Sequence, residues 1–87
     1  MRLNIHADKR KQEVALTTIE QILGVNLIRE YICGYYRIDG YDEINKIAYE
    51  IDEDHHKYRV EEDTERENYI KNILNCSIVR VKLYKEA

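Results

Sequence analysis

The sequence has no proline, phenylalanine or tryptophan, and it contains only three glycines and two cysteines. With 44% hydrophobic residues and so few chain breakers, the composition indicates a compact globular protein and excludes a disordered one. We expect residues 1–87 to form a single domain, because a chain this short builds one modest core. Cys33 and Cys76 lack the spacing of a disulfide framework and are interpreted as reduced, small apolar residues.

Long hydrophobic segments are also missing. No apolar run approaches the roughly 20 residues that span a bilayer, and the first ten residues, MRLNIHADKR, show no apolar segment typical of a secretory signal. We therefore expect a cytoplasmic location and no membrane partner. The aromatic residues are eight tyrosines, which can pack their rings at core edges or binding surfaces while their hydroxyls stay hydrated.

The net charge of −3 is distributed unevenly along the chain. Residues 38–67 contain 12 acidic and four basic side chains, whereas residues 1–37 carry a net +2 and residues 68–87 a net +3. Such an acidic stretch is either a solvated face or a group of carboxylates that a bound cation neutralises. Because phosphate contacts need Lys and Arg, we expect the acidic stretch to bind nucleic acid poorly by itself.

Apolar periodicity predicts an α/β (α+β) domain with a small mixed sheet. A helical stripe that includes Leu16 and Ile19 ends before Gly24, and Asp8 is a suitable N-cap for that helix. Apolar and polar residues then alternate, strictly in 36–39 and 47–52 and loosely in 25–33, which indicates half-buried strands. The expected order is a helix over 8–23, strands over 25–33, 36–39 and 47–52, a helix over 61–75 and a strand over 77–83.

Three carboxylates are predicted to meet on the hairpin formed by the second and third strands. Alternation puts Glu50 and Asp52 on one face of the third strand and Ile51 on the other. Asp39 lies on the second strand, and we expect it to converge on the same patch. Carboxylate oxygens are hard ligands, so Asp39, Glu50 and Asp52 form a candidate site for Mg²⁺ or Mn²⁺.

Further groups near this hairpin suit phosphate chemistry. His56 follows Asp52 by four residues and could take a proton from a metal-bound water near neutral pH. Asp63 could orient that imidazole or bind the metal. Arg66 and Arg80 are candidates for contacts with a phosphate, or for bracing the acids.

The chain contains, in this order, YRID (36–39), YEIDE (49–53) followed by His56, DTER (63–66) and VRV (79–81). This ordered set resembles the compact endonucleases related to the very-short-patch mismatch repair enzyme, in the E-D-x-H-D branch of the PD-(D/E)xK superfamily. It is also similar to a phage homing endonuclease and to viral endonuclease-like domains. The resemblance covers about residues 9–84 and implies a restriction-endonuclease-like core, in a protein encoded by a bacterium, phage or mobile element.

The resemblance also implies roles for particular residues. The acid on the opening helix corresponds to Glu13, with Glu20 as the competing choice. The strand aspartate corresponds to Asp39, the histidine to His56, and the last acid to Asp63. All of these, with Glu50 and Asp52, are therefore candidate catalytic residues.

Two positions depart from the family pattern. The usual superfamily lysine would fall at Asp52, so His56 is the better candidate for the base. Glu53 stands where the family often has glycine. Glu50 and Asp52 are then either additional metal ligands or residues that support the ligands.

The resemblance implies a DNA endonuclease domain that hydrolyses phosphodiester bonds with Mg²⁺ or Mn²⁺. We expect targeting through a separate DNA-binding domain or a homodimer, because the domain is small and acidic. Two alternatives remain open: a catalytically inactive nuclease-like binding module of a phage or viral regulator, and an acidic domain that binds a basic protein.

Overall fold

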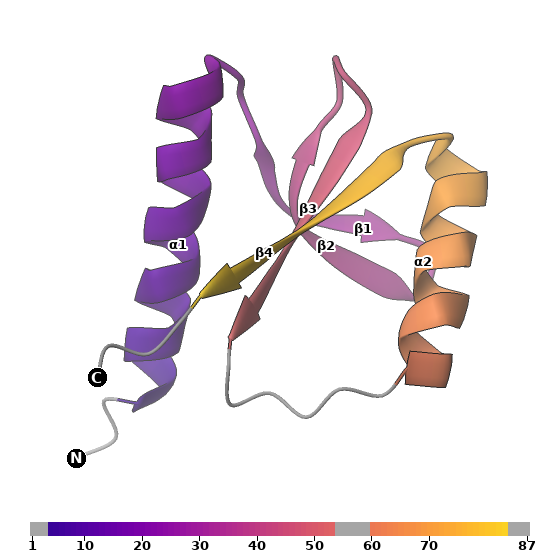
Figure 1. Cartoon of the computed structure of the whole chain (residues 1–87), viewed down its shortest axis with the longest axis horizontal. Helices are drawn as coiled ribbons and strands as arrows, with labels where there is room; N and C mark the ends of the chain where they lie inside the picture. The colour runs from indigo at the N-terminus through magenta and orange to yellow at the C-terminus, as the bar shows by residue number, and fades with distance from the viewer. Residues whose placement is uncertain (1–3, 54–59, 84–87) are drawn as a thin grey trace.

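The computed structural model describes residues 4–53 and 60–83, and its ribbon is shown in Figure 1. The element order predicted from the sequence is confirmed. The elements are α1 (Asn4–Leu23), β1 (Ile28–Cys33), β2 (Tyr36–Asp42), β3 (Ile47–Glu53), α2 (Val60–Leu74) and β4 (Ser77–Leu83). Among these residues, neither helix combines the length and the apolar character needed to cross a membrane.

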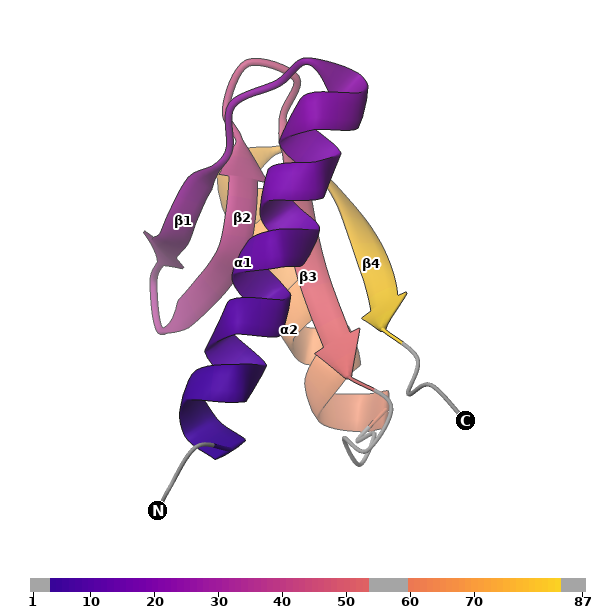
Figure 2. The same ribbon diagram turned by 90° about the vertical axis from the view of Figure 1, so that its left-hand side faces the viewer.

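The four strands form one mixed sheet in the order β1-β2-β3-β4. The first three strands pair antiparallel, and β4 pairs parallel with β3 because α2 carries the chain back across the sheet. Figures 1 and 2 show α1 covering one face of the sheet and α2 the other. The mixed sheet expected from the sequence is therefore present, with a helix on each face.

The prediction that Asp8 caps the first helix is wrong, since α1 already begins at Asn4. No Gly or Pro precedes Asp8 to stop the helix from extending, and Asn has the same preference for helix starts as Asp. The predicted end is correct: Gly24 adopts a φ of 67°, and its N–H donates to the Glu20 carbonyl at 2.8 Å.

Two apolar clusters hold the three layers together. The cluster between the sheet and α2 is built on the buried residues Cys33, Ile38, Tyr41, Ala48 and Ile70. The cluster between the sheet and α1 is built on the buried residues Leu16, Leu27 and Tyr49. Cys33 and Cys76 are free thiols, as predicted.

Strand β2 changes the face on which its side chains alternate. Ile38 and Tyr41 are three residues apart, yet both belong to the α2-side cluster. Gly40, between them, faces α1 so closely that a Cβ there would lie 2.7 Å from Leu16 Cδ2. Regular alternation would keep residues 38 and 40 on one face. The reversal therefore falls at Asp39.

The neighbouring strand reverses at the same level of the sheet. Arg29 reaches α1, whereas Tyr31 packs in the α2-side cluster. Between them Glu30 has a φ of 48°, in the left-handed region that a glutamate seldom adopts. The pairing of Arg29 with Gly40 and of Tyr31 with Ile38 is preserved, so β1 and β2 change face together. This double reversal decides where the candidate site lies.

Candidate functional site

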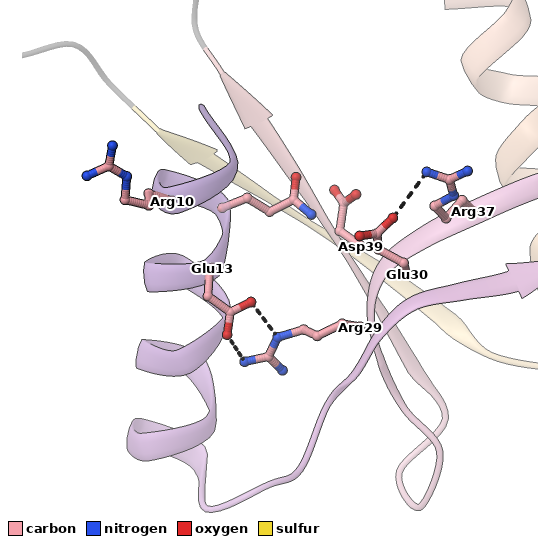
Figure 3. Close-up of a pocket in the computed structure, with 7 residues that line it drawn as sticks. Arg10, Glu13, Arg29, Glu30, Arg37 and Asp39 are labelled. Atoms are coloured by element: carbon pink, nitrogen blue, oxygen red, sulfur yellow. Dashed lines mark hydrogen bonds and ion pairs between the residues drawn. The ribbon is translucent and has the colours of Figure 1, made fainter. Parts of the chain in front are cut away.

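A pocket of about 470 Å³ opens between α1 and the β1–β2 hairpin (Figure 3). Charged side chains of both signs dominate its wall. The residues that line it are Arg10, Gln12, Glu13, Arg29, Glu30, Arg37 and Asp39. The pocket therefore joins Asp39, the strand acid of the family resemblance, with Glu13, one of its two candidates for the helix acid.

Asp39 is half-buried in this pocket, and its carboxylate accepts a hydrogen bond from β3 where the backbone pairing of β2 and β3 ends. The last residues paired between β2 and β3 on this side are Gly40 and Tyr49. Beyond them, Asp39 Oδ2 accepts a hydrogen bond from the Ile51 backbone N–H at 2.8 Å. Burial raises the pKa of Asp39, and the Ile51 N–H and the charge of Arg66 offset only part of that effect.

Glu50 lies opposite Asp39 in the strand register, one position beyond the last pair. It is only 6% exposed and forms an ion pair with Arg66 of α2 at 2.5 Å. Its second oxygen, Oε2, is buried and accepts no hydrogen bond from any residue that the structure describes. Burial raises the pKa of Glu50, Arg66 lowers it in part, and the charge of Asp39 raises it further.

The prediction that the three carboxylates of the hairpin converge on one patch is wrong. Glu50 and Asp52 do share a face, with Ile51 in the opposite cluster, and both contact arginines on the α2 side. Asp39 instead opens into the pocket beside α1. The reversal of β2 causes this difference, because alternation extrapolated from Ile38 cannot anticipate it.

Asp52 and Asp63 belong to a second cluster, around Arg80 of β4. Arg80 Nη1 donates to both Asp52 oxygens at 3.1 Å, and Nη2 lies 3.8 Å from Asp63 Oδ1. Arg80 Nε also donates to Glu67 Oε2 at 2.7 Å. The cluster ties β3, β4 and α2 together, and its Arg80 is only 20% exposed. Arg80 thus braces acids, which is one of the two roles that the sequence suggested.

Arg66 is engaged in a similar way. Besides its ion pair with Glu50, it donates to the Arg37 carbonyl at 2.7 Å and lies 5.8 Å from the centre of the Tyr36 ring. Its side chain is 20% exposed. A contact between Arg66 and a phosphate would require it to give up these partners.

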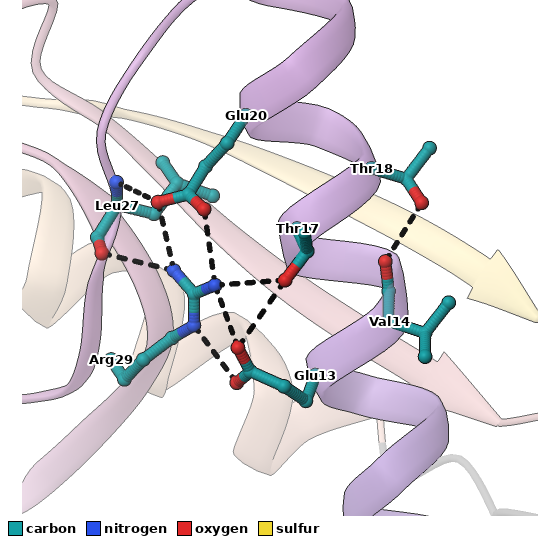
Figure 4. Close-up of polar contacts among 7 residues, drawn as sticks. All are labelled: Glu13, Val14, Thr17, Thr18, Glu20, Leu27 and Arg29. Atoms are coloured by element: carbon teal, nitrogen blue, oxygen red, sulfur yellow. Dashed lines mark hydrogen bonds and ion pairs between the residues drawn. The ribbon is translucent and has the colours of Figure 1, made fainter.

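The two candidate acids of α1 are both bound by Arg29 (Figure 4). Arg29 contacts Glu13 through Nε at 3.0 Å and Nη2 at 2.9 Å, and Glu20 through Nη1 at 3.0 Å and Nη2 at 3.1 Å. Glu20 also accepts the Leu27 N–H at 2.8 Å. Hydrogen bonds from Arg29 lower the pKa of both glutamates. Glu13 lines the pocket, whereas Glu20 anchors the start of β1.

A divalent cation fits part of the predicted ligand set. Among the described residues, no group of three or more His, Cys, Asp or Glu side chains is arranged to hold a metal ion. Mg²⁺, however, is commonly held by one or two carboxylates together with waters and substrate phosphates. Asp39 and Glu50 meet that requirement, since both are disfavoured by burial and Glu50 keeps an unbonded oxygen. Asp52 does not, because Arg80 donates hydrogen bonds to both of its oxygens, and Asp63 lies on α2 in an ion pair with the same arginine.

His56, the candidate base, lies outside the residues that the structure describes. Four residues that line the pocket were not among the predicted site residues: Arg10, Arg29, Glu30 and Arg37. Arg37 carried one signal, because it stands two residues before Asp39 in the alternating segment. The other three come from α1 and β1, and no local pattern links them to Asp39.

Comparisons with known proteins found no match for this chain. No protein-family model matches it, no curated protein matches it, and no solved structure matches it.

Proposed function

We propose that this protein is a divalent-metal-dependent endonuclease domain that hydrolyses phosphodiester bonds in DNA. The observation that carries the proposal is the Asp39–Glu50 pair. These two carboxylates lie opposite each other in the strand register, burial disfavours the charged form of each, and Asp39 lines an open pocket. A fold retains such a pair at a cost in stability, and a bound cation would remove that cost.

Asp39 and Glu50 would hold Mg²⁺ or Mn²⁺. When bound, the ion would polarise a phosphoryl oxygen and lower the pKa of a bound water. The Ile51 N–H holds one oxygen of Asp39, so the other oxygen would contact the ion, while Arg66 keeps Glu50 in position. Glu13 is a better candidate than Glu20 for the helix acid, since only Glu13 lines the pocket.

The assignment of the catalytic base comes from the sequence alone. His56 would accept the proton of the attacking water. Asp52 and Asp63, held by Arg80, would support the third strand and α2 rather than bind metal. With a net charge of −3, the domain would be targeted by a separate DNA-binding domain or through a homodimer.

The test is cleavage of supercoiled plasmid at low salt with Mn²⁺, Mg²⁺ or a chelator. We expect metal-dependent nicking that is lost in Asp39→Asn and in His56→Ala. Glu43→Gln is the matched control, because Glu43 is an exposed acid of the β2–β3 turn. This variant should cleave the plasmid like the wild type. Cleavage that persists in chelator, or in Asp39→Asn, would contradict the proposal.

A second candidate is a nuclease-like binding module without catalysis. It is favoured by one observation: Glu13, Asp52 and Asp63 are all neutralised by arginines rather than free for a metal. Calorimetric titration with Mn²⁺ distinguishes the two. Binding that disappears in Asp39→Asn supports the nuclease, and the absence of binding by a folded wild type supports the module.

A further inference from the structure

The five arginines of the described chain fall into two groups. Three are held by acids: Arg29 by Glu13 and Glu20, Arg66 by Glu50, and Arg80 by Asp52, Asp63 and Glu67. Arg10 and Arg37 are exposed, and both line the same pocket as Asp39. The sequence offered Arg66 and Arg80 either for phosphate contacts or for bracing the acids, and both are paired with acids inside the fold.

Arg37 is available for a new partner. Its side chain is 63% exposed, and its ion pair with Glu30 spans 3.1 Å between two exposed groups. Pairs of this kind contribute little to stability, since water solvates both charges and salt screens them. A phosphate could therefore replace Glu30 at small cost, whereas replacing the buried partner of Arg66 would leave Glu50 without a counter-charge.

Arg10 is available for a different reason. It projects from α1 at the rim of the pocket and makes no ion pair or hydrogen bond with another described residue. Figure 3 shows Arg10 on one side of Asp39 and Arg37 on the other, on elements that are separate in the sequence. The candidate metal-binding carboxylate thus lies between two exposed guanidinium groups.

We propose that Arg10 and Arg37 bind two phosphates of one DNA strand that crosses the pocket, one on each side of Asp39. This inference rests on the proposed function for its choice of ligand. The guanidinium group suits the task because its planar donors match phosphate oxygens in pairs. With three carboxylates in the same pocket, these two arginines supply the positive charge that a phosphodiester strand requires.

The expected effect follows from counterion release. Each phosphate contact contributes about 0.9 to the slope of log affinity against log salt for duplex DNA. If the affinity at 1 M salt is unchanged, losing one contact weakens binding about 15-fold at 50 mM salt and about fourfold at 200 mM. Losing both should remove about 1.8 from the slope.

Fluorescence anisotropy tests the inference. A short labelled DNA duplex is titrated with the protein at salt concentrations from 50 to 200 mM, and a chelator prevents cleavage. The variants are Arg10→Gln and Arg37→Gln, singly and together. The matched controls are Lys11→Gln, the exposed neighbour of Arg10 on α1, and Lys46→Gln in the exposed β2–β3 turn; neither lysine lines the pocket.

The inference holds if both arginine variants lose slope and affinity while both lysine variants keep them. It is overturned if the arginine and lysine variants lose equally, if wild type fails to bind duplex at 50 mM salt, or if inorganic phosphate binds but DNA does not. The proposed function fails separately: a protein that binds DNA through Arg10 and Arg37 but never cleaves it is no nuclease. A nuclease whose arginine variants bind normally loses only this inference.

Discussion

Arg29 holds α1 against β1, and replacing it with methionine tests how much of the stability depends on that attachment. Arg29→Met keeps an unbranched apolar stem like the methylene part of arginine and removes every donor. Glu13 and Glu20 then lose their counter-charge, and the Leu27 carbonyl loses a donor at 3.0 Å. The carboxylates would remain beside each other without a cation.

The expected loss can be worked from exposure. Glu13 is 57% exposed, so its pair with Arg29 is worth about 0.5 kcal/mol. Arg29 and Glu20 are 29% and 24% exposed, and charged hydrogen bonds in such a setting contribute about 1.5–3 kcal/mol. The sum, about 2–3.5 kcal/mol, corresponds to a fall of roughly 8–28 °C in Tm for a domain of this size.

The pH dependence of the stability loss distinguishes the ion pairs of Arg29 from the packing of its side chain. Hydrogen bonds from Arg29 lower the folded-state pKa of Glu13 and Glu20 below their ordinary value of 4.5. The stabilisation is therefore present above that value and is lost as the pH falls through the folded-state pKa values. Wild type and Arg29→Met should differ fully at neutral pH and converge in strong acid.

Urea denaturation followed by circular dichroism, at pH 7 and again near pH 3, measures both quantities. Arg37→Met is the matched control, because its exposed pair with Glu30 should contribute below about 1 kcal/mol at either pH. A loss for Arg29→Met no larger than that control, or one that is the same at both pH values, would refute the reasoning.

Three further predictions concern the wall of the pocket. Gly40→Ala should cost about 1–3 kcal/mol in urea denaturation, because the new Cβ would lie 2.7 Å from Leu16 Cδ2; an unchanged midpoint would show that Leu16 moves aside freely. Glu30→Gly should raise the free energy of unfolding by about 1 kcal/mol, since glycine adopts a φ of 48° without strain. A lower Tm for this variant would mean that the Glu30 side chain stabilises the fold by more than its backbone conformation costs. Asp39→Asn should raise Tm near pH 7 but not near pH 3. Burial raises the folded-state pKa of Asp39, so the folded protein is most stable when this carboxyl is protonated, below its unfolded-state pKa. That stability is lost as the pH rises through the folded-state pKa, and asparagine, which carries no charge, avoids the loss. A variant less stable than wild type at pH 7 would contradict that sign.

Much of the architecture was predictable because its signals are local. The alternation in 77–83 matches β4 residue for residue, and Gly24 ends α1 as expected. Helix starts were less predictable, as the position of Asp8 inside α1 demonstrates, because Asp is favourable at a cap but costs only a few tenths of a kcal/mol inside a helix.

The candidate site was predictable only in its chemistry. Asp39 and Glu50 could be selected because acids on paired strands must lie near each other. Which acids remain available could not be predicted, because Arg80 lies 28 residues from Asp52 and Arg29 lies 16 residues from Glu13. Ion pairs at such separations depend on how the layers pack.

The sequence by itself determined the helices, the strands and their order, since each depends on periodicity and on end signals within a few residues. Only the tertiary structure decided which acids face a pocket and which arginines stay exposed beside it. The reason is the paired reversal at Glu30 and Asp39, which turns Asp39 toward α1 while Glu50 stays toward α2. That reversal requires two strands to change face together, a condition that no short stretch of sequence records.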